Sequence, residues 1–134
     1  MLAAPLSGVL SFLLYFASGA LLLAAFSLIY VHVTPHAEFA LIRKGNTAAA
    51  TGFGGALLGY TLPLASAIAH SVSFPDMLLW GLVGLVVQVA VLGVMRLLMP
   101  RLFIDMEKGQ LAPALLLATV SLAAGLINAA SMTY

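Results

Sequence analysis

Two short polar stretches indicate how this sequence is organised. They are Arg43-Lys44-Gly45-Asn46 and Glu107-Lys108-Gly109-Gln110, and they begin sixty-four positions apart. Each stretch leads directly into a long segment without any charged residue. Apolar helices match one another easily by chance, but a repeated Lys-Gly-amide triplet does not belong to that background. We therefore predict an internal duplication, with repeat one at about residues 8–70 and repeat two at about 73–134.

The composition places the chain in a membrane. Of 134 residues, 63% are hydrophobic and 7% are charged, whereas roughly a quarter of the residues in soluble domains carry charge. Four uncharged segments can each cross a hydrocarbon core about 30 Å thick at about 1.5 Å per residue, namely 8–31, 47–69, 77–95 and 111–132. We predict an all-α integral membrane protein, with four transmembrane helices as two parallel-oriented repeats of a two-helix hairpin.

The parts outside the bilayer are short. They leave no room for a soluble catalytic domain, so we expect residues 1–134 to form a single membrane domain. A net charge of +1 provides no basic face for nucleic acid, which excludes that class of partner. The lack of cysteine excludes thiolate chemistry and Cys-ligated metals.

The cations predict the orientation. They lie near the first and third connections, which four alternating spans place on one side, and the positive-inside rule makes that side cytoplasmic. Both termini then face the periplasm. Matching positions are separated by an even number of spans, so a pseudo-twofold axis along the membrane normal should relate the repeats. The residues concerned are Arg43, Lys44, Arg96, Arg101 and Lys108.

The first connection predicts a short interfacial helix, because Thr34-Pro35 has the pattern of an N-cap followed by proline and Gly45 that of a helix end. Its apolar residues would lie at the headgroup boundary while Glu38 and the cations face water. Residues 100–109 repeat this pattern. Both connections would form a cytoplasmic interface made of Glu38, Arg43, Lys44, Asn46, Arg101 and Lys108.

Small residues predict which spans pack closely. Helices in lipid gain little hydrophobic free energy by meeting, so close contact depends on small side chains. Such residues recur with a period of about four in spans two and four, which we expect to form the central pair. Alternatively, the glycines make room for a substrate. The helix-packing residues are Gly52, Gly55, Gly59, Ser121 and Gly125.

A few polar residues lie within the spans. Pro63 removes a backbone hydrogen bond from span two, and Gln88 is the deepest strongly polar side chain. These residues would either line a small polar cavity toward the outer half or satisfy one another between helices. The full set is Tyr60, Pro63, Ser66, Gln88 and Asn128.

Metal and cofactor sites are not expected. His32, His36 and Glu38 have the residue types of a metal site, but Thr34-Pro35 interrupts the helix that would align the histidines. Arg96 reads as an anchor whose long side chain reaches the headgroups. Catalysis needs a positioned acid, base or metal, and the carboxylates lie at the two surfaces, so we expect neither an enzyme nor a bound cofactor.

Several motifs resemble those of the YjfL-type bacterial inner-membrane proteins. They are Thr34-Pro35-His36-x-Glu38, Asn46-Thr47-Ala48-Ala49 and the ending Ile127-Asn128-Ala129-Ala130-Ser131-Met132-Thr133-Tyr134. The resemblance covers nearly the whole chain. It implies two copies of a two-span unit in a multi-pass inner-membrane protein of unknown function, sometimes associated with envelope-stress genes. Gln110 replaces the asparagine in the second repeat, so a role for Asn46 does not carry over.

Two functions fit these observations. The first is a non-enzymatic scaffold or oligomeric component in envelope maintenance, whose partners would be membrane lipid, further copies of the chain or a cytoplasmic stress-response protein. The second is a small oligomeric transporter or channel. A proton-coupled exporter of the small multidrug-resistance kind would need a glutamate inside the membrane, and the four spans have none.

Overall fold

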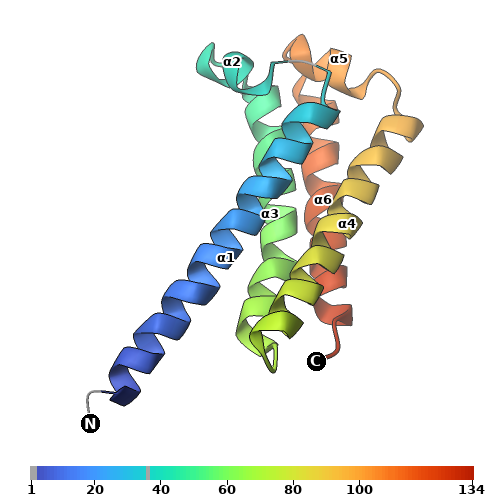
Figure 1. Cartoon of the computed structure of the whole chain (residues 1–134). Coiled ribbons are helices and arrows are strands. Elements are labelled where there is room, and N and C mark those ends of the chain that lie inside the picture. Colours follow the sequence, from blue (N-terminus) through green and yellow to red (C-terminus); the bar gives the residue numbers. More distant parts are fainter. Residues whose placement is uncertain (1–2, 36) are drawn as a thin grey trace.

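The computed structural model describes residues 3–35 and 37–134, and within them the chain forms six α-helices and no strand. The helices are α1 (Ala3–Val33), α2 (Glu38–Arg43), α3 (Thr47–His70), α4 (Phe74–Leu98), α5 (Leu102–Glu107) and α6 (Leu111–Ser131). Four of them, α1, α3, α4 and α6, are long and apolar enough to cross a membrane. The predicted all-α class with four transmembrane helices is confirmed. Figure 1 shows both short helices at one end of the bundle.

Capping explains where α4 begins. The Ser73 hydroxyl accepts a hydrogen bond from the backbone N–H of Asp76 at 3.3 Å, and Pro75 stands in the first turn. Because proline is well tolerated there, α4 begins before the charge-free segment that marked it in the sequence.

The short helix after α1 begins later than expected. Thr34 does not cap it, because the Thr34 hydroxyl donates back to the carbonyl oxygens of Tyr30 and Val31 at 3.1 and 3.2 Å. These bonds close the last turn of α1, as threonine does when it bonds to the turn before it. Helix α2 therefore starts at Glu38, and its N-cap residue Ala37 makes no side-chain cap bond.

Helices α3 and α6 form the central pair, and α4 packs against both of them. Helix α1 packs against α3 and α4 and makes no substantial contact with α6 among the described residues (Figure 1). A twofold axis would place α1 against α6 as α4 lies against α3, so α1 departs from the symmetry that the repeat predicts. The aromatic side chains of α1 have their partners on α3, in the contact that corresponds to the one between α4 and α6.

Those aromatic side chains form a buried column between α1 and α3. The ring of Phe26 lies 5.2 Å from that of Tyr60, and the ring of Tyr30 lies 5.1 Å from that of Phe53. Such tilted pairs contribute roughly 0.5–1.5 kcal/mol beyond their buried area. Toward its N-terminus α1 leaves the bundle, and its large apolar side chains there are exposed (Figure 1).

Candidate functional site

The collar is the end of the molecule formed by residues 34–35, 37–46 and 99–110, which include α2 and α5 (Figure 1). Its two helices end in the same way. Gly45 has a φ of 87° and Gly109 a φ of 86°, a left-handed conformation that glycine adopts without steric cost. The amide after each glycine donates to the carbonyl five residues upstream, at 2.9 and 3.0 Å. This Schellman-type ending occurs after both short helices, at the two positions that the predicted repeat makes equivalent.

Asn46 joins the two halves of the collar. Its Oδ1 accepts a hydrogen bond from the backbone N–H of Ala49 at 3.0 Å and so caps α3. Its Nδ2 donates to the carbonyl oxygens of Met106 and Glu107, both at 3.1 Å, at the end of α5. Gln110, the equivalent residue, makes no side-chain cap bond. The polar triplet therefore follows both short helices, but only the first triplet ties the two halves of the collar together.

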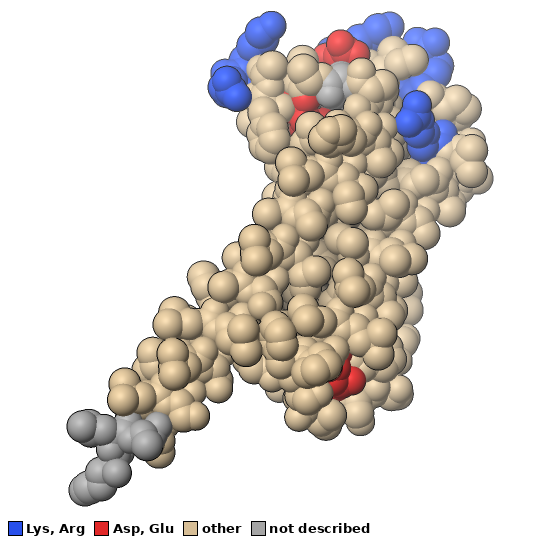
Figure 2. All heavy atoms as spheres, in the orientation of Figure 1, with Lys and Arg blue, Asp and Glu red and all other residues tan. Residues whose placement is uncertain are grey.

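Positive charge gathers at the collar end. Five cations lie there with three carboxylates, Glu38, Asp105 and Glu107, which leaves a net charge of +2. Asp76 lies at the opposite end of the bundle, and Figure 2 shows this separation along the molecule. The cations are Arg43, Lys44, Arg96, Arg101 and Lys108, and all five are exposed.

Two of the arginines make contacts that the sequence did not indicate. The Arg96 guanidinium donates from Nη1 to the carbonyl oxygen of Val33 at 3.0 Å, so it also ties α4 to the last turn of α1. Nε of Arg101 lies 3.9 Å from Oδ1 of Asp105. A pair this long and this exposed contributes little to stability, and it leaves the Arg101 guanidinium available to another anion.

Glu38 does not face water, contrary to the sequence-based expectation. It is fully buried, while the exposed residues of α2 are Phe39, Ala40 and Arg43. The later start of α2 explains this difference, because it turns the first helical residue toward the bundle. The Glu38 carboxylate lies within electrostatic reach of the buried Tyr30. The collar interface therefore consists of its cations and Asn46, with Glu38 beneath them.

Tyr30 is the residue of this region that sequence reasoning missed. Its side chain is fully buried, and its hydroxyl has no hydrogen-bond partner within the described part of the chain. Its position near the end of span one could have indicated it, because tyrosines are enriched at the membrane surface.

Glycines bring the central helices into contact. A Cβ atom on Gly55 would overlap Ala118 of α6, and one on Gly59 would overlap the carbonyl of Ser121. A Cβ atom on Gly125 would in turn overlap the carbonyl of Gly59. Gly52 differs from these, since it lies against the side chain of Met106 beneath the collar. Four of the five predicted packing residues thus meet between α3 and α6.

Pro63 accounts for the contact between Gly59 and Gly125. Proline has no N–H, so the carbonyl of Gly59, four residues earlier, lacks its helical partner. That carbonyl lies directly against Gly125 of α6. Close approach of a glycine Cα to a carbonyl oxygen is a weak hydrogen-bonding geometry that recurs where helices cross. The proline thus helps to set where the two helices touch.

Gln88 binds the third helix of the centre. Its Nε2 donates to the Ser121 carbonyl at 3.1 Å, and the side chain is 2% exposed. Its Oε1 has no hydrogen-bond partner among the described residues and faces Gly59. A neutral amide in this position links α4 to α6 near the middle of the membrane-spanning segments.

The other polar residues lie apart from one another. The Tyr60 hydroxyl donates to the carbonyl of Gly81 at 2.8 Å, and the Ser66 hydroxyl lies 2.8 Å from that of Tyr134. Nδ2 of Asn128 is buried without a hydrogen-bond partner among the described residues. The structure therefore places these side chains at several depths, where most of them bond to a neighbouring segment.

No cluster of three or more His, Asp or Glu side chains suited to a metal ion occurs within residues 3–35 and 37–134. His32 forms a hydrogen bond with the carbonyl of Leu28 at 2.7 Å. His36 lies outside the described residues.

A family model described as Domain of Unknown Function (DUF350) matches residues 4–132. Over 129 residues the chain is 42% identical to the UPF0719 inner membrane protein YjfL of Escherichia coli (strain K12), covering 96% of this chain and 98% of that protein. It is 33% identical over 97 residues to the UPF0719 transmembrane protein YshE of Bacillus subtilis (strain 168), covering 69% of each. No solved structure matches the chain.

Proposed function

This chain belongs to the DUF350 family, as its motifs implied, and we propose that it is a non-enzymatic scaffold of envelope maintenance. It is a multi-pass inner-membrane protein. In the proposal the collar faces the cytoplasm, both termini face the periplasm, and the collar cations bind the anionic headgroups of the inner leaflet.

The observation that carries the proposal is the gathering of five exposed cations at one end of the bundle. Each lysine or arginine near an anionic membrane surface contributes about 1 kcal/mol of attraction. Because the carboxylate of Glu38 is buried, it adds little negative charge to the exposed surface of the collar.

The rest of the molecule supports a rigid framework for this surface. Both collar helices end in a glycine motif, and Asn46 bonds the first half of the collar to the second. Beneath them α3 and α6 touch through glycines that leave no space for a side chain. The helices and connections that carry the cations are therefore held in a defined arrangement.

Complementation of a deletion strain under envelope stress tests this function. At matched protein levels, the double change Arg43→Gln and Lys44→Gln should impair growth, because it removes about 2 kcal/mol of surface attraction. The matched control exchanges the same two residues, Arg43→Lys and Lys44→Arg, and should restore growth since it keeps both charges. Full growth of the glutamine double variant would reject the role of the collar charge.

A transporter or channel is the second candidate, and one observation favours it. Oε1 of Gln88 and Nδ2 of Asn128 are buried in the spans and have no hydrogen-bond partner among the described residues. A conduction path needs such groups, whereas a scaffold needs only satisfied ones. Under the scaffold proposal, Gln88→Leu and Asn128→Ala lower stability modestly and leave growth under stress intact. Loss of growth with either variant stably inserted, while the Arg43 and Lys44 double variant grows normally, would favour transport.

A further inference from the structure

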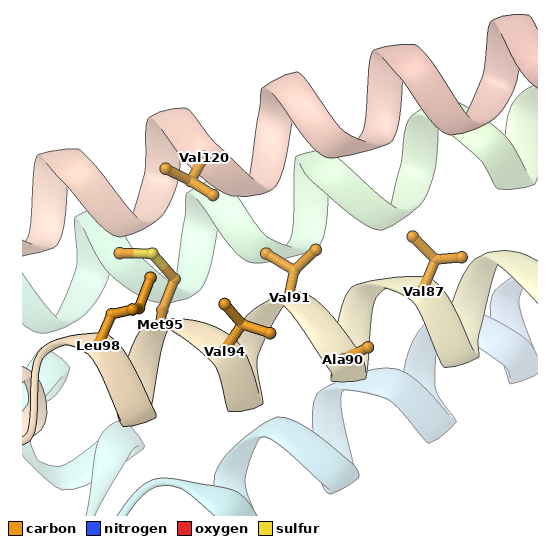
Figure 3. Close-up of a pocket in the computed structure, with 7 residues that line it drawn as sticks. All are labelled: Val87, Ala90, Val91, Val94, Met95, Leu98 and Val120. Atoms are coloured by element: carbon orange, nitrogen blue, oxygen red, sulfur yellow. The ribbon is translucent and has the colours of Figure 1, made fainter.

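A groove of about 450 Å³ runs along the surface of the bundle between α4 and α6. Figure 3 shows the lining side chains, which come from α4 except for Val120 of α6. On α4 they recur at positions 87, 91, 94 and 98, so they form one stripe along the helix. The lining residues are Val87, Ala90, Val91, Val94, Met95, Leu98 and Val120.

The groove is about as long as the hydrocarbon part of one leaflet is thick. It begins near the middle of α4 and ends in the last turn before the collar. From Val87 to Leu98 the helix rises roughly 17 Å at about 1.5 Å per residue, and half of a hydrocarbon core is roughly 15 Å thick. A single acyl chain that enters from the collar side would therefore fill it lengthwise.

The lining favours a lipid chain over another helix. Close helix association in membranes depends on small residues and interhelical hydrogen bonds. The groove is lined mainly by valines and larger apolar side chains, and its single small residue is Ala90. The glycines that allow close approach are used between α3 and α6. A flexible chain can follow this branched surface where a second helix would be held away from it.

An exposed cation follows the collar end of the groove along the chain. Arg101 follows Leu98 by three residues and stands at the start of α5. Its side chain is 68% exposed, and Asp105, its partner at 3.9 Å, holds it only loosely. The guanidinium group offers several N–H donors in a fork that suits a phosphate group.

We propose that this groove is a binding site for one anionic phospholipid, whose acyl chain lies along α4 between Val87 and Leu98 and whose headgroup binds Arg101. The inference deepens the proposed function and rests on it for the side of the membrane that the collar faces. It adds a defined site to what is otherwise a diffuse attraction between charges.

Native mass spectrometry of the full chain tests the site, with phosphatidylglycerol and phosphatidylethanolamine that carry identical acyl chains. The wild type should retain one phosphatidylglycerol, preferred over phosphatidylethanolamine by about fivefold, the effect of one surface cation. Ala90→Phe places a ring in the groove and should abolish that retained lipid. Ala123→Phe is the matched control, because Ala123 is exposed on α6 and does not line the groove.

Charge variants separate this site from the general attraction of the collar. Arg101→Gln should remove the preference for phosphatidylglycerol, whereas Arg43→Gln, on α2, should leave it unchanged. If the preference survives in Ala90→Phe and falls with Arg43→Gln instead, the groove inference fails and the proposed collar function stands. If the wild type shows no preference, both fail. A dimer that Ala90→Phe converts to a monomer would show that a second copy occupies the groove, which also overturns the inference.

Discussion

At the scale of single residues, Asn46 shows how one side chain gives unequal roles to two similar stretches of sequence. Its amide satisfies the first turn of α3 and also the last carbonyls of α5, groups that helix ends leave without intrahelical partners. Gln110 occupies the equivalent position but makes no cap bond. The two side chains differ by one methylene group, and only the shorter one joins the two halves of the collar.

Asn46→Ala should lower the free energy of unfolding by about 1–2 kcal/mol, because it removes a helix cap and two interhelical hydrogen bonds. Gln110→Ala is the matched control and should change it by less than about 0.5 kcal/mol. Denaturation by SDS in mixed micelles measures both values. Equal losses at the two positions would contradict the assignment of the link to Asn46.

At the scale of elements, the closest contact in the molecule is between α3 and α6, and it depends on which face of each helix carries glycine. Gly55 and Gly59 point at α6, whereas a Cβ atom on Gly54 would meet nothing within 4 Å. The spacing of small residues indicated the pair of spans. The directions of individual glycines became clear only when both backbones were in place.

Gly59→Leu should destabilise the protein by about 3 kcal/mol or more, since the side chain would overlap the backbone of α6. Gly54→Leu makes the same change on the same helix, where a side chain has open space. It should be neutral or stabilising by about 0.5 kcal/mol, because leucine favours the helix over glycine. Thermal denaturation in detergent compares them. Similar melting temperatures for the two variants would show that α3 and α6 do not pack as described.

At the scale of the whole molecule, the separation of charge along the bundle is the feature that connects the fold to the membrane. The collar end carries a net charge of +2, and the opposite end carries Asp76. Hydrogen bonds from Asn46 and Arg96 hold the collar end together, while the outer half of α1 leaves the bundle. The collar end therefore combines the positive charge with hydrogen bonds between segments.

Labelling of single cysteines tests the proposed orientation, and the cysteine-free natural chain is the control. Val72→Cys, in the exposed turn before α4, should react in intact spheroplasts with a maleimide that does not cross membranes. Lys44→Cys, in the collar, should react only after permeabilisation. The reverse pattern would place the collar outside and remove the basis for its contact with the inner leaflet.

The sequence alone determined the features that depend on composition and spacing. Four long apolar segments require four spanning helices, and glycine after a basic residue marks where each collar helix ends. The side-chain partners of Asn46, the burial of Glu38 and the position of α1 against α4 were decided by tertiary structure. Apolar helices in lipid have no hydrophobic pattern that identifies their neighbours. Those neighbours are selected by the fit of particular glycines, aromatic rings and amides, which exists only once the helices are packed.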